Sequence, residues 1–155
     1  MLETLFGKCL TVFAMAMVPV VELRGAIPLG VAQGLPPLLV YLMAVLGNMV
    51  PVPFIILLVR RVFDWLRRGS FWGPKIVALE HRAHLKGRVV RKYRLPGLII
   101  LVAIPLPGTG AWTGALVAAL FDIRLRSAVP AILLGVLIAG GIMLAVSLGL
   151  VALWF

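Results

Sequence analysis

Three long stretches of the sequence contain no charged residue. They cover residues 25–59, 95–121 and 127–155. A helix of roughly 20 apolar residues crosses the hydrocarbon core of a bilayer, so each stretch is long enough to do so. Of the 155 residues, 63% are hydrophobic and 13% are charged, whereas about a quarter are charged in a soluble domain. A water-soluble globular protein is excluded, and the sequence predicts an all-α integral membrane protein.

The positive charge is concentrated in one segment. Eleven of the fifteen Lys and Arg residues lie between Arg60 and Arg94, together with only two of the five acidic residues. Short basic segments beside membrane spans stay in the cytoplasm. We therefore expect residues 60–94 to form a cytoplasmic linker in a multi-pass protein of the cell (plasma or inner) membrane. Nucleic-acid binding is the disfavoured alternative, because the basic segment adjoins apolar runs on both sides.

The linker carries a helical pattern of its own. Steps of three and four residues connect five apolar or aromatic positions and one lysine on a single helix face, at Ile76, Leu79, Ala83, Lys86, Val90 and Tyr93. This pattern predicts a basic amphipathic segment that lies in the membrane interface and contacts anionic lipid head groups. A simple orientation anchor is the alternative.

Metal and disulfide chemistry are not expected. His81 and His84 are three residues apart, but no other ligand accompanies them, and the single Cys9 cannot form an internal disulfide. We expect no metal and no cofactor. The apolar stretch 9–21 is similar to a signal peptide, but Glu3 stands where a basic residue belongs, so we interpret it as mature sequence.

Proline and glycine interrupt two of the apolar regions. The first, residues 5–59, is too long for two spans plus a loop and contains Pro19, Pro28 and Gly30. The second, residues 95–121, is broken by prolines and glycines between positions 105 and 114. Because proline removes a helical donor and glycine loosens the backbone, we expect a re-entrant helical hairpin in each region.

A short repeat connects the two hairpins. Residues 26–30, Ala-Ile-Pro-Leu-Gly, match residues 103–108, Ala-Ile-Pro-Leu-Pro-Gly, at an offset of half the chain. A long uncharged segment follows each match. One hairpin plus one transmembrane helix crosses the membrane an odd number of times, so the two halves would form an inverted repeat. The two hairpin tips would then meet near the midplane, with both termini outside.

The predicted domain organisation follows from this repeat. Residues 1–155 form a single membrane domain, in which residues 1–59 are the first repeat, residues 60–94 the linker and residues 95–155 the second repeat. Two spans leave much helix surface uncovered, so we expect a homodimer.

Glu22 and Arg24 are the only charged residues between Lys8 and Arg60. A charge at membrane depth costs several kcal/mol unless it is paired or hydrated, which makes such residues functional candidates. Glu22 could take up and release a proton, and the planar guanidinium of Arg24 suits phosphate or carboxylate. Alternatively, both residues lie at the outer interface and only mark a loop.

The second tip offers backbone rather than charge. A helix that starts after Gly108 presents unpaired amides that attract anions, and threonine hydroxyls stand beside them. Alternatively, the glycines there only allow helices to pack closely. Asn48, with Pro51 and Pro53, predicts a kinked and partly polar wall facing the same cavity. The candidate substrate- and proton-binding residues are Glu22, Arg24, Pro28, Asn48, Pro105, Pro107, Gly108, Thr109, Gly110, Trp112 and Thr113.

Two of these motifs carry a family resemblance. Residues 22–28, Glu-Leu-Arg-Gly-Ala-Ile-Pro, and residues 105–114, Pro-Leu-Pro-Gly-Thr-Gly-Ala-Trp-Thr-Gly, resemble the bacterial and archaeal small multi-drug export proteins. That family is distantly similar to the DedA/VTT-domain superfamily. The resemblance implies paired re-entrant hairpins and movement of undecaprenyl phosphate or other lipids with proton-motive force, with Glu22 matching a hairpin acid. The arginines of the second DedA hairpin are absent here, and residues 94–97 offer a shifted substitute.

The leading hypothesis is a proton-linked membrane transporter or flippase for an amphipathic anion such as a lipid phosphate. A small exporter of hydrophobic cations, with Glu22 as the exchangeable site, is the first alternative. A non-transporting membrane assembly factor is the second. An enzyme is not expected, because the membrane segments contain no pairing of nucleophile and base.

Overall fold

The regular structure of the chain is helical. The computed structural model describes residues 2–69, 71, 73–75, 77–78, 81 and 87–154. All regular elements in these residues are α-helices, which confirms the all-α prediction for this part of the chain. In chain order they are α1 (Leu2–Met17), α2 (Glu22–Ala32), α3 (Pro37–Met49), α4 (Pro51–Arg67), α6 (Gly87–Ala103), α7 (Ala111–Leu120) and α8 (Leu125–Trp154).

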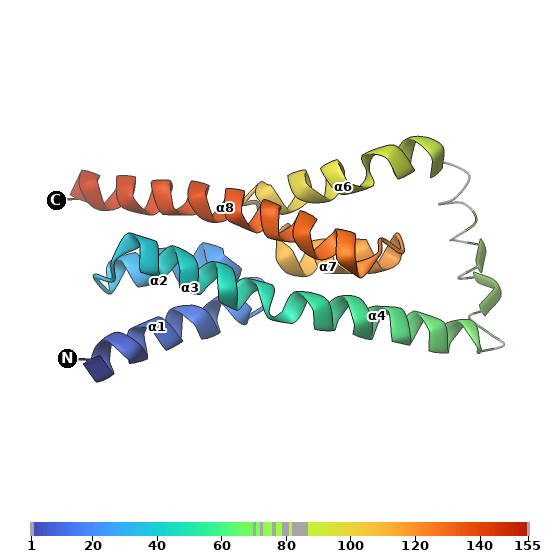
Figure 1. Ribbon diagram of the computed structural model, residues 1–155, viewed down its shortest axis with the longest axis horizontal. Helices are drawn as coiled ribbons and strands as arrows, with labels where there is room; N and C mark the ends of the chain where they lie inside the picture. Colours follow the sequence, from blue (N-terminus) through green and yellow to red (C-terminus); the bar gives the residue numbers. More distant parts are fainter. Residues whose placement is uncertain are drawn as a thin grey trace.

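The helices are arranged in two halves along one long axis (Figure 1). In the first half α1 runs toward the middle of the molecule, α2 returns, and α3 and α4 then run along its length. In the second half α6 runs toward the middle from the opposite end, α7 turns back, and α8 runs the length in the other direction. Both termini lie at one end, and the facing ends of α4 and α6 lie at the other.

Two helical runs are long and apolar enough to cross a membrane. They cover Pro37–Arg67, with 31 residues, and Leu125–Leu153, with 29 residues. Only 39% of each apolar window is buried inside the protein. Large apolar side chains such as Leu38, Phe54 and Leu58 are therefore exposed. A helix on the surface of a soluble protein turns a polar face outward, whereas these helices suit contact with lipid.

Both predicted helix interruptions are present. The first lies at residues 18–21 between α1 and α2, and the second at residues 104–110 between α6 and α7. Gly108 and Gly110 have φ angles of 82° and 132° in the second turn, a region that favours glycine. A straight helix over residues 95–121 is excluded.

The short sequence repeat, however, pairs positions that are not equivalent. Residues 26–30 lie inside α2, whereas residues 103–108 end α6 and enter the turn after it. The predicted alignment at this offset is therefore wrong, because a proline inside a helix and prolines in a turn share letters but not geometry. Element order pairs α3 with α8 instead, and their first residues, Pro37 and Leu125, are 88 positions apart.

Glycines allow the closest helix crossings in each half. A Cβ built on Gly47 of α3 would overlap the Phe13 carbonyl oxygen of α1 and lie 3.1 Å from the Ala16 Cβ. A Cβ on Gly135 of α8 would lie 2.9 Å from the Ile99 carbonyl oxygen of α6. The α1–α3 and α6–α8 pairs are thus packed backbone to backbone, as small residues permit in membrane helices.

Helices extend into the predicted linker from both sides. The last residues of α4 reach Arg67, and α6 begins at Gly87. Most of the amphipathic pattern, at Ile76, Leu79, Ala83 and Lys86, lies outside the described residues, as does His84.

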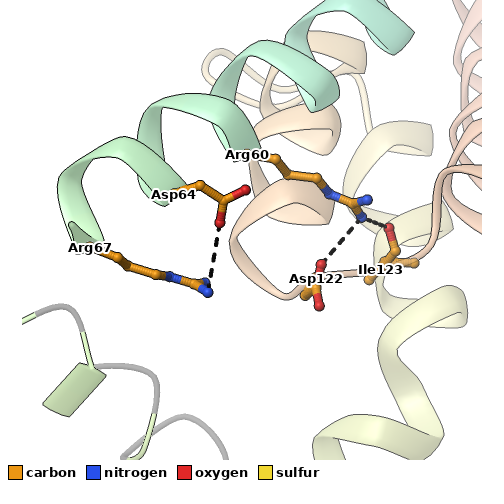
Figure 2. Close-up of polar contacts among 5 residues, drawn as sticks. All are labelled: Arg60, Asp64, Arg67, Asp122 and Ile123. Carbon is orange, nitrogen blue, oxygen red and sulfur yellow. Dashed lines mark hydrogen bonds and ion pairs between the residues drawn. The ribbon is translucent and has the colours of Figure 1, made fainter. Parts of the chain in front are cut away.

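The charged end of α4 is tied to the second half of the chain (Figure 2). The Arg60 guanidinium donates a hydrogen bond to the carbonyl of Ile123 and lies 3.7 Å from the Asp122 carboxylate, in the turn between α7 and α8. Asp64 and Arg67 form a second ion pair at 3.8 Å within α4. Exposed ion pairs contribute about 0–1 kcal/mol, so the bond to the Ile123 carbonyl is the more important tie.

The crossing glycines give the first testable prediction. Gly47→Ala should destabilise the protein by about 1–3 kcal/mol, because the new methyl group meets backbone that cannot move aside. Gly141→Ala is the matched control, since a Cβ there meets nothing within 4 Å and only improves helix propensity. Thermal unfolding of both variants in detergent checks this, and a Gly47→Ala protein as stable as the control would contradict the packing.

Candidate functional site

The two turns meet in the middle of the molecule, where the first residues of α2 and α7 face each other (Figure 1). Glu22 is the first residue of α2, and Ala111 is the first residue of α7. Side chains at the start of α2 contact backbone groups of the second turn and of α7, across more than 80 positions of sequence. The site is therefore built by the contact between the two halves.

The Glu22 carboxylate binds the start of α7. Its side chain is only 4% exposed, and its Oε1 accepts a hydrogen bond of 3.2 Å from the backbone N–H of Trp112. The first turn of a helix has unpaired amides with partial positive charge, which favour an anion there. Any Cβ at Gly110 would overlap Glu22 Oε2. Glycine at this position is what allows the carboxylate to approach the helix.

Arg24 holds the second turn. Its Nη2 donates to the carbonyl of Thr109 and, at 2.9 Å, to the Thr109 hydroxyl. That hydroxyl also accepts from the Leu106 N–H at 3.2 Å and donates to the Ile104 carbonyl at 2.7 Å, with the Leu106 carbonyl as a second acceptor at 2.8 Å. One threonine thus connects the guanidinium to the backbone of the whole turn.

Trp112 adds a third tie between the halves. Its indole Nε1 donates to the carbonyl of Met17, the last residue of α1, at 3.2 Å. A helix end leaves its last carbonyls without intrahelical donors, so the indole satisfies one of them. Thr113 bonds within its own segment, from its hydroxyl to the Gly108 carbonyl at 2.9 Å.

Asn48 of α3 is a buried amide without a partner. Its exposed fraction is 0%, and neither Oδ1 nor Nδ2 forms a hydrogen bond within the described part of the chain. An unsatisfied buried polar group costs about 1–3 kcal/mol, so its retention in an apolar interior needs a reason. Pro51 and Pro53 follow directly and supply no N–H to the carbonyls of Gly47 and Met49, which makes this part of the wall still more polar.

Asn48 lines the same pocket as the two charged side chains. The pocket is narrow, and in this conformation it has no room for a small-molecule substrate. Glu22, Arg24 and Asn48 are its polar side chains. Its other lining residues are Leu23, Gly110, Ala111, Val102, Val136 and Ala139.

The first turn is strained beside this pocket. Val20 and Glu22 have φ angles of 76° and 47°, in the left-handed region that residues with side chains rarely adopt. Each such residue costs of order 1 kcal/mol and persists only where the surroundings hold it. The contacts of Glu22 with α7 stabilise this backbone conformation.

The predicted residues divide into two groups. Glu22, Arg24, Asn48 and Gly110 line the pocket, and Thr109 and Trp112 bond directly to them. The others do not line it: Pro105, Pro107 and Gly108 shape the second turn, Thr113 bonds to Gly108, and Pro28 lies inside α2. Pro28 cannot donate to the carbonyl of Arg24, four positions earlier, so it contributes only indirectly.

Sequence reasoning missed the apolar lining and one backbone acceptor. Val102, Val136 and Ala139 close the pocket, but they are indistinguishable in type from dozens of other apolar residues. The Met17 carbonyl accepts from Trp112 as a backbone atom, for which residue type gives no signal.

The unpartnered amide gives the second prediction. Asn48→Leu, which keeps the shape of the side chain, should stabilise the protein by about 1–3 kcal/mol, because a buried group without a partner is removed. Thermal unfolding measures this, with Ser147→Ala as the control, since the Ser147 hydroxyl is buried but bonded to the Met143 carbonyl at 2.7 Å. Destabilisation by Asn48→Leu would show that the amide has a structural partner.

Comparison with known proteins supplies a family for this arrangement. No curated protein and no solved structure matches the chain significantly. A family model described as "Putative small multi-drug export protein" matches residues 22–142, from the first residue of α2 into α8. Because this match spans well over half of the sequence and includes Glu22, Arg24 and the whole second turn, the protein belongs to the small multi-drug export family.

Proposed function

We propose that this protein moves an amphipathic anion, such as a lipid phosphate of the undecaprenyl phosphate type, across the cell membrane together with a proton. Membership of an export family and two helices long enough to span a bilayer indicate a membrane transporter rather than an enzyme. The substrate class and the proton coupling are the new elements, and the geometry of the pocket supports them.

The proposed topology is an inverted repeat with two re-entrant hairpins. Its support is the order of elements, in which α1, α2 and the α3–α4 run correspond to α6, α7 and α8. The two halves enter from opposite ends of the molecule, and their turns meet halfway (Figure 1). With the basic residues 60–94 on the cytoplasmic side, the site lies near the middle of the bilayer.

One observation supports an anionic substrate: the site already binds a carboxylate, that of Glu22. The Glu22 carboxylate lies on the N-terminus of α7, and Arg24 is bonded to the turn just before it. A helix N-terminus and a guanidinium both favour phosphate and carboxylate groups. The same chemistry repels a cation.

The surroundings of the turn favour an amphipathic substrate. Ile104 and Leu106 are 44% and 56% exposed on the outer side of the second turn, next to the polar contacts of Thr109. A lipid could therefore place its head group at the pocket while its chain stays in the hydrocarbon. A path of this kind avoids the cost of moving a charged head group through hydrocarbon without polar partners.

Glu22 is the proposed proton carrier. It is the one acidic side chain lining the pocket, and it lies there with Arg24 and the neutral Asn48. A carboxyl that changes between charged and neutral forms alters its bond to the Trp112 N–H, which joins the two halves. Proton transfer would in this way be linked to the contact between the turns.

We also propose that the basic end of the molecule, residues 60–94, lies at the cytoplasmic membrane interface. Trp65 and Phe71 are 71% and 70% exposed there, near Arg61 and Arg68 in sequence. Aromatic rings and basic side chains together are typical of residues at the level of anionic head groups. The protein is further proposed to form a homodimer.

Export of hydrophobic cations is the second candidate. The family description names multi-drug export, and Glu22 could bind a cation and a proton alternately. Under this alternative Arg24 would have no direct role.

Transport in reconstituted liposomes provides the third prediction. Flux of a labelled lipid phosphate should fall about tenfold or more in Glu22→Gln, because this side chain cannot carry a proton. It should fall to a similar extent in Arg24→Ala, which loses a charge-assisted contact worth about 1.5–3 kcal/mol. Asp64→Asn and Arg61→Ala are matched controls at exposed positions of α4 and should keep the wild-type flux.

The outcomes separate the candidates. Wild-type flux in both Glu22→Gln and Arg24→Ala would refute the anion proposal. Cells tested in parallel for tolerance to lipophilic cations should show no dependence on Glu22. Tolerance that is raised by expression, lost in Glu22→Gln and kept in Arg24→Ala would establish cation export instead.

A further inference from the structure

The anion position at the N-terminus of α7 is filled by the chain itself. The Glu22 carboxylate accepts the Trp112 N–H, and Gly110 leaves just the space that its second oxygen occupies. The donors of a first helical turn are few, so two anionic groups cannot both use them. A substrate anion and the charged form of Glu22 therefore compete for the same place.

Asn48 indicates that a second ligand belongs in this pocket. Its amide is fully buried, lines the pocket with Glu22 and has both a donor and an acceptor without partners in the described residues. The contacts that the chain makes account for Glu22 and Arg24 but leave Asn48 unused. A ligand group with both an acceptor and a hydroxyl would satisfy the amide completely.

We propose that Glu22 is an internal substitute for the substrate anion. The anion binds at the start of α7 only when Glu22 is neutral and has left that position, and Asn48 then forms hydrogen bonds with the substrate head group. This inference rests on the proposed function and specifies how its substrate and proton are coupled. One proton and one anion enter the pocket together, and they leave together. The empty site is held closed by the carboxylate itself.

The charges around Glu22 are compatible with this exchange. Arg24 on α2 is the one cationic side chain that lines the pocket, and it bonds Thr109 of the second turn. α3 presents the neutral Asn48, and α6, α7 and α8 present apolar residues and Gly110. Replacing the carboxylate by a substrate anion keeps one negative charge beside Arg24, so the net charge of the site is conserved.

Asn48 also points to a class of head group. A phosphate monoester carrying one proton offers an acceptor oxygen and a P–OH donor, which match the amide N–H and C=O. A sulfate ester has the same single charge but no hydroxyl. The pocket should therefore prefer a singly protonated phosphate ester to a sulfate ester of the same chain length.

The test measures binding and proton uptake by the full-length protein in lipid nanodiscs. Hexyl sulfate is the first probe, because its charge does not change with pH and any pH dependence comes from the protein. The wild type should take up about one proton for each hexyl sulfate bound, and its affinity should rise by up to about tenfold for each unit by which the pH falls. Glu22→Gln should bind hexyl sulfate with no proton uptake and no pH dependence, and more tightly than the wild type at alkaline pH. Asp64→Asn should behave as the wild type.

Hexyl phosphate, used below about pH 6, where it carries one proton, is the second probe. Asn48→Leu should lose about tenfold in affinity for hexyl phosphate and less for hexyl sulfate, because only the phosphate uses both groups of the amide. A comparable loss of affinity for both probes would show that Asn48 does not recognise the phosphate hydroxyl.

The remaining outcomes separate this inference from the transport function. Anion binding by the wild type without proton uptake, or a Glu22→Gln protein that binds more weakly than the wild type at every pH, would overturn the substitution mechanism even if lipid flux is observed. Absence of hexyl sulfate binding in a protein that moves lipid phosphate would overturn it as well. Proton-linked binding without lipid flux would support the mechanism and remove the transport proposal.

Discussion

Two charged side chains in an apolar interior must find partners, and in this protein the partners come from the other half of the chain. Glu22 bonds the first turn of α7, and Arg24 bonds Thr109 in the turn before it. Leaving either charge unpaired in an apolar interior would cost several kcal/mol. This requirement holds the two turns together and so fixes how the halves meet. The indole of Trp112 on the Met17 carbonyl reinforces the same junction.

The junction is not arranged for stability alone. Val20 and Glu22 adopt left-handed backbone conformations, and the Asn48 amide has no partner within the described residues. Each feature costs about 1 kcal/mol or more. Elsewhere the two halves pack closely, with Gly47 and Gly135 at backbone crossings. Glu22 and Asn48 thus place backbone strain and an unsatisfied amide at the pocket, which is where a binding function would require them.

The sequence predicted the class of the fold because uncharged runs can only be helical and buried or in contact with lipid. It also predicted both interruptions, and it placed Glu22 and Arg24 beside the first of them. It failed on the alignment of the repeat, because Pro28 lies inside a helix while Pro105 lies in a turn. Pro96 and Pro130 also lie inside helices. A proline removes one hydrogen bond, and tertiary packing decides whether the helix continues. The partner of Glu22 is the Trp112 backbone N–H. The glycines before α7 indicated a helix start with free amides, but no residue pattern indicated that Glu22 itself binds there.

The central claim is that both turns lie at the middle of a bilayer and approach it from opposite sides. Spin labels test this claim. Single cysteines are introduced at the exposed turn residues Val20 and Pro107, with Cys9 replaced by Ala. The depth of each label is measured by its relative accessibility to oxygen and to a water-soluble nickel complex. Both labels should be near the bilayer midplane, accessible to oxygen and shielded from nickel, while a label at Asp122 should be at head-group depth. A label at either turn that is found at head-group depth would contradict the proposed placement in the membrane and the mechanism built on it.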